Sequence, residues 1–221
     1  MRQLEEQLKG LLDRVVLMGT TAESMIQRAI GALTSRNEDD CKEVFTKEQL
    51  VNALQLEVDD RAVKLTALQQ PVARDVRFLF MASKIATELE RIADQAVNIS
   101  ENVHYVLESP PMTQPVDLPS MAQIAQKMVR DSLSAMVSHD VGLANSVLEE
   151  EKKVDAFRDQ IFHTLLADLR GQAGGAQRDI SLILIARNLE RIGDHATNIA
   201  EEVIYWLQGR DVRHGRGIKG V

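Results

Sequence analysis

The sequence lacks most of the features that accompany β-rich or disulfide-bonded proteins. Aromatic residues make up only 4% of the 221 residues, and Pro (5) and Gly (12) are scarce. The single cysteine, Cys41, excludes an intramolecular disulfide and suits a reducing compartment. Ala, Leu, Glu, Gln and Arg, which lose little rotamer freedom in a helix, are abundant instead. We therefore expect an all-α protein without a sheet.

Long hydrophobic runs and an excess of positive charge are also missing. The longest apolar stretch, near Leu182 to Ala186, is far too short to span a bilayer, and the first residues lack the apolar core of a secretion signal. Lys and Arg number 26 against 33 Asp and Glu, a formal net charge of −7 that disfavours general nucleic-acid binding. The sequence has no GxxxxGK phosphate loop. We expect a cytoplasmic protein that reaches a membrane only through partners.

Proline and glycine divide the chain into two parts. Four of the five prolines lie in residues 109–119, a joint that no helix can cross because Pro lacks a backbone donor. The joint separates a first domain, 1–108, from a second, 120–208, and we expect the basic, glycine-rich tail at 209–221 to be disordered. Apolar periodicity and capping residues predict three long helices in each domain. These helices are expected at 1–35, 38–69, 72–107, 119–138, 140–170 and 178–208.

The two domains are related in sequence. Residues 85–107 align without a gap on 185–207, so that ELERIADQAVNISENV lies over NLERIGDHATNIAEEV. Polar as well as apolar positions agree, which amphipathic periodicity alone does not explain. EQLVN from Glu48 aligns more weakly on EKKVD from Glu151. Each domain also has an Arg-Asp pair near the start of its third helix, Arg74-Asp75 and Arg178-Asp179. Duplication of a three-helix unit predicts two tandem antiparallel three-helix bundles with six long helices.

The repeated segment places its acidic and amide side chains on one face of a helix. Glu90, Asp94, Asn98 and Glu101 fall within about 80° of one another at 3.6 residues per turn, nearly opposite the apolar residues. The second copy supplies Glu190, Asp194, Asn198 and Glu201. Like charges four residues apart destabilise a helix unless a partner compensates them, and carboxylates are ligands of Mg²⁺, Mn²⁺, Fe, Zn²⁺ and Ca²⁺. We call the two sets the acidic stripes.

The residues alone allow two interpretations of the acidic stripes. In one, helix five adds Glu151 and Asp155 at the same spacing, and two antiparallel neighbouring helices hold a metal ion between them. In the other, the stripes are solvated faces that Arg91 and Arg191 neutralise directly. His195 is expected at a core edge rather than as a metal ligand.

Several strings in the sequence resemble the PhoU family. They are LERIADQAVNISE, LERIGDHATNIAE, QPVARDVR at 70–77 and EEKKVD at 150–155, and the resemblance covers nearly the whole chain. It implies two similar three-helix bundles, often in a homodimer, whose E(D)xxxD motifs bind metal in some members. It also implies negative regulation of phosphate uptake and of phosphate starvation signalling. The implied partners are the ATPase of a phosphate ABC transporter and a sensor histidine kinase at the inner membrane.

The resemblance also assigns roles to individual residues. The residues implied as metal ligands are Glu48, Glu90, Asp94, Glu151, Asp155, Glu190 and Asp194. Additional ligands or supporting residues are Asn52, Asn98, Glu101, Asn198, Glu201, Asp75, Asp179, Arg91 and Arg191. Asn52 departs from the family pattern, which has Asp there, so we expect the first domain to bind metal more weakly.

Three functions follow from these patterns. The leading hypothesis is a non-enzymatic, metal-binding adaptor in phosphate homeostasis. The second is a metal-dependent phosphohydrolase or oxidase; Glu101 and His104 have the spacing of di-iron ligands, but the second domain has Ile204 in the equivalent place. The third is a metal-free helical docking protein whose stripes bind a basic partner surface.

Overall fold

The computed structural model describes residues 2–110, 116–171, 175–210 and 212, and within these ranges it contains six α-helices. The helices are α1 (Arg2–Ser35), α2 (Asp39–Gln69), α3 (Ala73–Glu108), α4 (Leu118–Ser138), α5 (Val141–Gly171) and α6 (Ala176–Gln208). No strand occurs in the described ranges, so the expected all-α class is confirmed. Most of the joint, at 111–115, and most of the expected tail, at 211 and 213–221, lie outside the described residues.

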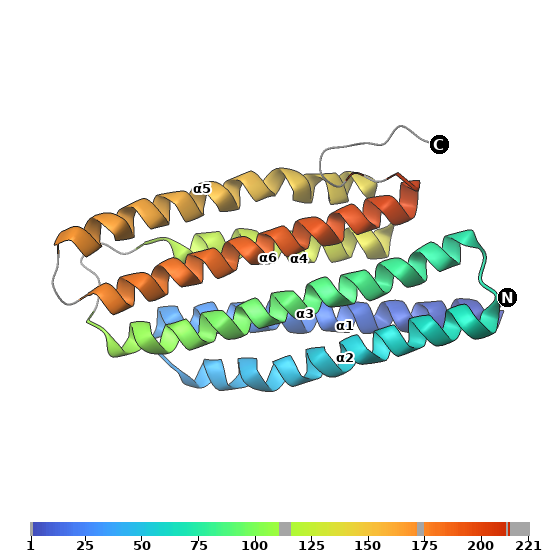
Figure 1. Cartoon of the computed structure of the whole chain (residues 1–221), viewed down its shortest axis with the longest axis horizontal. Coiled ribbons are helices and arrows are strands. Elements are labelled where there is room, and N and C mark those ends of the chain that lie inside the picture. Colours follow the sequence, from blue (N-terminus) through green and yellow to red (C-terminus); the bar gives the residue numbers. More distant parts are fainter. Residues whose placement is uncertain (1, 111–115, 172–174, 211, 213–221) are drawn as a thin grey trace.

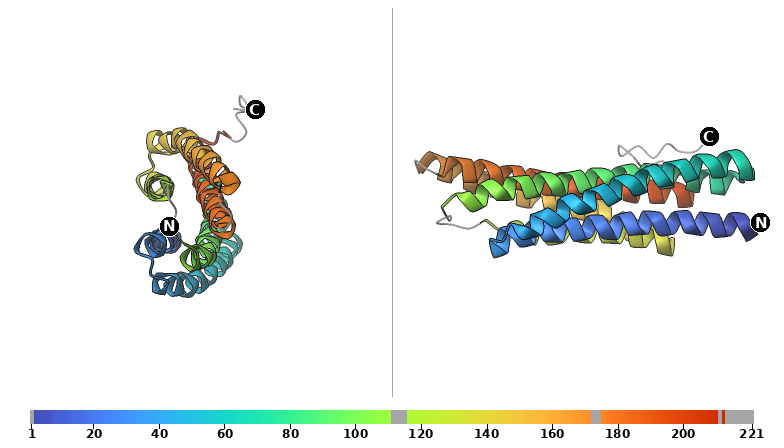
Figure 2. Two further views of the ribbon diagram at one scale, coloured as in Figure 1. Left: turned by 90° about the vertical axis from the view of Figure 1, so that its left-hand side faces the viewer. Right: turned by 90° about the horizontal axis from the view of Figure 1, so that it is seen from below.

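The helices form two three-helix bundles that lie side by side (Figure 1). Helices α1, α2 and α3 all contact one another, and so do α4, α5 and α6. The bundles meet mainly along α3 and α6, and α1 and α4 make a second contact between them. Seen end-on, the six helices follow a curved layer with α3 and α6 in its middle (Figure 2). The acidic stripes therefore belong to the two central helices of the molecule.

The apolar side of each stripe helix is buried as its periodicity predicts. Leu89, Ile92 and Ile99 of α3 are completely buried, and their counterparts in α6 are equally buried. A continuous core of Leu, Ile, Val, Met and Ala runs through both bundles. This packing fixes the rotation of α3 and α6, and it leaves their acidic side chains at the edges of the core rather than at its centre.

The helix ends differ from the sequence expectations by one or two residues. Asn37 Oδ1 accepts a hydrogen bond from the backbone N–H of Asp39 (3.1 Å), which satisfies one free donor at the start of α2. Asp117 caps α4 in the same way through the N–H of Ser120 (3.1 Å), so α4 begins just before Pro119. Helix α6 begins at Ala176, inside the loop expected at 171–177. Within the part of the chain that is described, no helix is both long and apolar enough to cross a membrane.

Candidate functional site

In the second bundle, the structure brings the predicted carboxylates of α5 and α6 together. Glu151 and Asp155 lie on the side of α5 that faces Glu190 and Asp194 of α6. Partial burial raises the pKa of Glu151, and the negative charges of Asp194 and Asp155 raise it further. Burial also raises the pKa of Asp194, with Asp155 adding to the effect. Four acidic groups therefore share a partly desolvated strip between the two helices, which we call the second acidic face.

An arginine that was not predicted lies within the second acidic face. The guanidinium of Arg158 on α5 donates a hydrogen bond to Glu190, and it also makes an ion pair with Asp159 (2.9 Å). Asp155 lies 3.9 Å from the same group. Burial raises the pKa of Glu190, whereas the nearby Arg158 opposes that shift. Arg158 thus makes the direct ion pair with this face, whereas the expected Arg191 acts on Asp194 through its charge alone.

In the first bundle, Glu48 of α2 and the pair Glu90 and Asp94 of α3 form the equivalent group, the first acidic face. Partial burial and the neighbouring Asp94 raise the pKa of Glu90, and Glu48 contributes in the same direction. Burial raises the pKa of Asp94 as well. Arg91 lies 3.7 Å from Glu88, and its positive charge, like that of His195, opposes the raised pKa of Glu90. Among the described side chains, no Lys or Arg forms an ion pair with these three carboxylates.

Asn52 completes the first acidic face. Its Nδ2 lies at the limit of a hydrogen bond to Glu48 Oε1 (3.5 Å). Its Oδ1 is shielded from solvent and accepts no hydrogen bond from any described group. A buried carbonyl oxygen without a donor is uncommon, because leaving it unsatisfied costs about 1–3 kcal/mol. At the position where the family pattern has Asp, the amide oxygen of Asn52 is therefore left without a donor.

The two faces differ in how well they fit a metal ion. As the side chains stand, no three of the described His, Cys, Asp and Glu residues converge closely enough to hold one. The first acidic face nevertheless offers three carboxylates without an ion pair to a described Lys or Arg, and the unsatisfied oxygen of Asn52, all hard oxygen donors. These oxygen donors match the ligand chemistry of a divalent cation, but the described carboxylates do not converge on one point. In the second face a guanidinium occupies the acidic strip.

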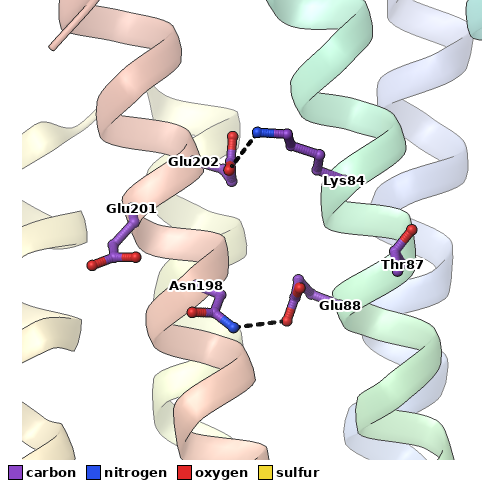
Figure 3. Close-up of a pocket in the computed structure, with 6 residues that line it drawn as sticks. All are labelled: Lys84, Thr87, Glu88, Asn198, Glu201 and Glu202. Atoms are coloured by element: carbon purple, nitrogen blue, oxygen red, sulfur yellow. Dashed lines mark hydrogen bonds and ion pairs between the residues drawn. The ribbon is translucent and has the colours of Figure 1, made fainter. Parts of the chain in front are cut away.

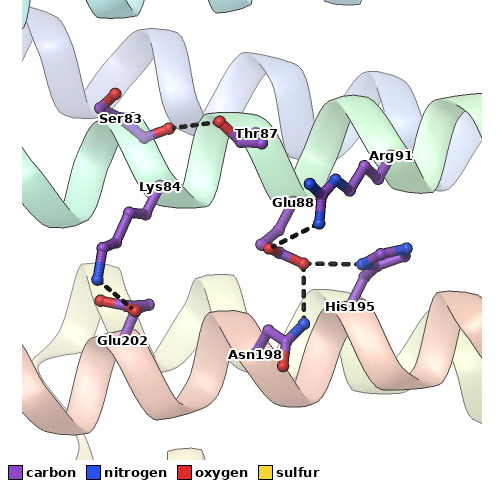
Figure 4. A network of polar contacts seen from close by, with 8 residues as sticks. All are labelled: Ser83, Lys84, Thr87, Glu88, Arg91, His195, Asn198 and Glu202. Atoms are coloured by element: carbon purple, nitrogen blue, oxygen red, sulfur yellow. Dashed lines mark hydrogen bonds and ion pairs between the residues drawn. The ribbon is translucent and has the colours of Figure 1, made fainter.

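A polar network joins the bundles along α3 and α6 (Figure 4). Glu88 Oε2 accepts hydrogen bonds from His195 Nδ1 (2.7 Å) and Asn198 Nδ2 (3.0 Å). Burial alone would raise the pKa of Glu88, but these two hydrogen bonds and the charges of His195 and Arg91 outweigh it and hold the pKa below its ordinary value. Asn198, expected in the acidic stripe that faces α5, turns toward α3 instead.

A second ion pair crosses the same seam. Lys84 Nζ lies 2.9 Å from Glu202 Oε1, and Glu202 is almost completely buried. Between this pair and Glu88 is a pocket of about 310 Å³, also lined by Thr87, Asn198 and Glu201 (Figure 3). Sequence reasoning missed Lys84, Glu88 and Glu202 because the repeat has Leu184, Asn188 and Asn102 in those places.

The remaining supporting residues lie outside the two acidic faces. Asp179 is buried against Arg178 (2.7 Å), which also pairs with Asp168 (2.8 Å). Asp75 lies in a different pocket, between the bundles, beside Arg74. On α3, Asn98 is partly buried and Glu101 is exposed, and Arg191 of α6 is exposed as well. The structure thus distributes the seven predicted carboxylates and Asn52 over two separate faces, one in each bundle, and leaves Asp75 and Asp179 outside both.

Comparison with known proteins agrees with this duplicated architecture. The family model of the PhoU domain matches twice, at residues 15–103 and 118–203. The chain is 34% identical over 212 residues to a protein of Zymomonas mobilis named phosphate-specific transport system accessory protein PhoU homolog, covering 96% of this chain and 89% of that one. A homolog of the same name from Caulobacter vibrioides is also 34% identical over 212 residues, covering 96% and 92%.

Solved structures share the fold. The crystal structure of PhoU from Pseudomonas aeruginosa superimposes with a TM-score of 0.89 at 30% identity, covering 93% of this chain and 99% of that chain. The phosphate transport system regulatory protein PhoU from Streptococcus pneumoniae, at 22% identity, has the same fold with a TM-score of 0.86 and coverage of 95% and 99%. The domain model matches twice and spans most of the sequence, and the relatives align over nearly its full length. The chain therefore belongs to the PhoU family.

Proposed function

We propose that this protein is a non-catalytic regulator of phosphate transport that restrains phosphate uptake and phosphate starvation signalling. Relatives named as accessory proteins of phosphate-specific transport align over 96% of the chain. The geometry adds one observation that carries the proposal further: each bundle places partly buried carboxylates from two neighbouring helices on one face. A cation that binds to such a face would cancel part of its negative charge.

The proposed adaptor uses the first acidic face as its metal-binding element. Glu48, Glu90 and Asp94, with the unsatisfied Oδ1 of Asn52, would hold the ion between α2 and α3. A bound divalent or trivalent ion of Fe, Mn, Mg, Zn or Ca would supply positive charge that offsets the repulsion between these carboxylates. The ligating residues would then fix the position of α2 relative to α3. The contacts between α3 and α6 would transmit this position to the second bundle.

The adaptor would act in the cytoplasm and link two partners at the inner membrane. By family resemblance, these are the ATPase of a phosphate ABC transporter and a sensor histidine kinase, and the chain itself would form a homodimer. In this proposal the helices provide binding surfaces for the partners and catalyse no reaction. No direct insertion into the bilayer and no contact with nucleic acid is part of the proposal.

The test combines partner capture with metal analysis. Tag-free protein is isolated from phosphate-replete cells after mild crosslinking, and its partners and metal content are measured by mass spectrometry. We expect the transporter ATPase and the kinase among the partners, and we expect Glu90→Ala with Asp94→Ala to lower the metal content. Glu149→Ala, an exposed acidic residue on α5, is the control. Phosphoester turnover or oxygen consumption that disappears in the double variant would favour the enzyme alternative instead.

One observation favours the metal-free docking alternative for the second bundle. Arg158 already bonds to Glu190 and lies beside Asp155, so a metal ion in this face would compete with the guanidinium. If metal is absent from the purified protein and partner binding weakens with added salt, the faces are docking surfaces for a basic partner.

A further inference from the structure

We propose that the apolar groove between α2 and α3 is a docking site for the chain's own basic segment at residues 213–221. The segment would lie along the first bundle, with its apolar side chains in the groove and its basic side chains toward neighbouring carboxylates. This intramolecular contact is independent of metal binding and goes beyond the regulatory function proposed above.

The groove has the character of an interaction surface. It has a volume of about 550 Å³, and most of its lining is apolar, with Val63 and Ala67 of α2 and Leu79 and Phe80 of α3 among its members. Val63 is 69% exposed and Phe80 is 66% exposed. Large apolar side chains that gather around one exposed hollow are typical of a surface that binds another segment.

The chain leaves α6 close to this groove. Gly209 has a left-handed φ of 67° and donates a backbone hydrogen bond to Tyr205 O (2.8 Å), which ends the helix. A Cβ added at Gly209 would lie 3.5 Å from Arg77 Nη1 of α3, and Val212 packs partly buried against the core. The end of α6 and the turn between α2 and α3 lie at the same end of the molecule (Figure 1). Phe80 follows Arg77 by about one helical turn, so the groove begins about 5 Å further along α3.

The segment is long enough to follow the groove. Residues 213–221 number nine, and at 3.1 Å per residue an extended chain of this length spans about 28 Å. The stretch of α3 from Phe80 to Asp94 measures about 21 Å at 1.5 Å per residue. The segment can therefore reach from the apolar groove to the first acidic face.

The sequence of the segment suits such a groove, because two rows of side chains repeat at every third residue. The basic row is Arg210, Arg213, Arg216 and Lys219, and the apolar row is Val212, Ile218 and Val221, with Gly215 in the remaining place. An extended chain with three residues per turn places each row along one edge. One edge can then enter an apolar groove while the other faces acidic side chains.

The charges of the segment and of the helices are complementary. Residues 209–221 have four basic side chains and one acidic side chain, whereas residues 1–208 have 22 basic and 32 acidic ones. Asp59 lines the groove itself, and the first acidic face continues about two turns further along the same two helices. Attraction between these charges favours the approach of the segment to this side of the molecule.

The corresponding groove of the second bundle is less suitable. It lies between α5 and α6, has a volume of about 340 Å³ and is lined by Arg158 and Arg187 as well as by Phe162 and Ile183. Two guanidinium groups at this groove would repel a basic segment. The difference between the bundles thus assigns the segment to the groove between α2 and α3.

Disulfide trapping in the full chain tests the contact. All variants have Cys41→Ala, which removes the buried thiol, and Ile218→Cys, which places a thiol in the segment. Thr66→Cys supplies a partner in the groove. The matched control is Asn145→Cys, an exposed position near the start of α5, at the same end of the molecule but beyond α6. Under oxidised glutathione, the disulfide with Thr66→Cys should form at least about tenfold faster, because docking raises the local concentration of the thiol.

Two further variants test whether the apolar groove holds the segment. Phe80→Ser removes an apolar wall and should lower the rate at Thr66→Cys to that at Asn145→Cys. Ile180→Ser removes an apolar side chain of similar exposure (51%) from α6 and should leave the rate unchanged. Circular dichroism should report the same helix content in all variants.

Three results would overturn the proposal. Equal rates at Thr66→Cys and Asn145→Cys would mean that the segment does not dock in the groove. A rate that Phe80→Ser does not change would mean that apolar contact does not hold it. Disulfides that join two chains rather than one, separated on a non-reducing gel, would mean that the segment of a second copy occupies the groove.

Discussion

Arg178 and Arg74 show how one sequence motif can serve two purposes. Both precede an aspartate near the start of the third helix of a bundle, yet Arg178 is almost completely buried and Arg74 is exposed. Arg178 pairs with Asp179 and Asp168 and donates a hydrogen bond to the carbonyl of Pro110 at the edge of the joint (3.1 Å). It therefore ties α5, α6 and the joint together, a role that the repeat does not require of Arg74.

Removal of the Arg178 side chain is expected to destabilise the protein strongly. Arg178→Ala leaves Asp179 buried without its cation, and uncompensated buried charges cost about 3–5 kcal/mol. Arg74→Ala is the matched control and should change the free energy of unfolding by less than about 0.5 kcal/mol. Urea unfolding followed by circular dichroism measures both. Similar small losses in the two variants would contradict the buried ion cluster.

At the residue scale the sequence predicted which carboxylates meet but not what compensates them. The i to i+4 spacing and the duplication placed Glu90 with Asp94, and Glu190 with Asp194, on one helix face, and their role as metal ligands stays a prediction. The expected neutralising residues, Arg91 and Arg191, directly follow a stripe residue and so point about 100° away from it on the helix. Arg158 lies on another helix, and only the packing of α5 on α6 brings it to Glu190.

At the scale of the element, α3 carries carboxylates whose pKa values shift in opposite directions. Glu88 lies on the side that faces α6, where donors hold its pKa low. Glu90 and Asp94 lie on the side that faces α2, where burial and mutual repulsion raise theirs. The rotation of one helix thus produces two different electrostatic environments only two residues apart.

Neutralising the first acidic face should stabilise the metal-free protein. Because the pKa values of Glu90 and Asp94 are raised by folding, the native state holds more protons than the unfolded state, so stability falls as pH rises through this range. Glu90→Gln with Asp94→Asn should raise the free energy of unfolding at pH 7 by roughly 0.2–0.5 kcal/mol per like-charge pair removed. This gain in stability should vanish as pH falls below the ordinary pKa values of the two groups, 4.5 for Glu90 and 3.8 for Asp94. Unfolding in the presence of chelator at several pH values measures it.

Neutralising Glu88 should have the opposite effect. Its pKa is lowered by folding, so it contributes stability that is present above the ordinary value of 4.5 and is lost as pH falls through the folded pKa. Glu88→Gln should therefore lower the free energy of unfolding at pH 7 by about 1 kcal/mol, since a charge-assisted hydrogen bond is weakened. The difference in unfolding free energy between Glu88→Gln and the wild type should become smaller at acidic pH. A variant as stable as the wild type at neutral pH would rule out the network across the seam.

The arrangement of the two bundles depends on contacts between helices, which the residue pattern of one helix does not predict. Hydrophobic periodicity predicted both bundles, because each helix buries one face within its own bundle. The seam between α3 and α6 depends on Lys84 and Glu88, which the repeat does not share, and on the antiparallel crossing that sets them opposite Glu202 and His195. The polar contacts across the seam thus come from positions at which the two copies differ.

The second contact between the bundles gives a direct test of their arrangement. Gly19 of α1 faces α4 so closely that an added Cβ would overlap Leu133 Cδ1 and lie 3.2 Å from its Cγ. Gly193 of α6 has more room: an added Cβ would lie 3.6 Å from Val154 and 3.7 Å from Met128, which is ordinary contact. Both sites are inside helices, so Ala in place of Gly gains the same helix propensity, about 1 kcal/mol.

The comparison between Gly19→Ala and Gly193→Ala therefore isolates the cost of overpacking between α1 and α4. We expect Gly19→Ala to be less stable than Gly193→Ala by about 1–3 kcal/mol, the usual cost of forcing a methyl group into a packed interface. Gly193→Ala itself should match or exceed the wild type, since the first bundle has Ala93 at this position. Adding Leu133→Ala to Gly19→Ala should remove the steric part of the loss. If the two glycine variants unfold at the same denaturant concentration, the bundles do not approach each other through α1 and α4 in solution, and the seam along α3 and α6 must hold them together alone.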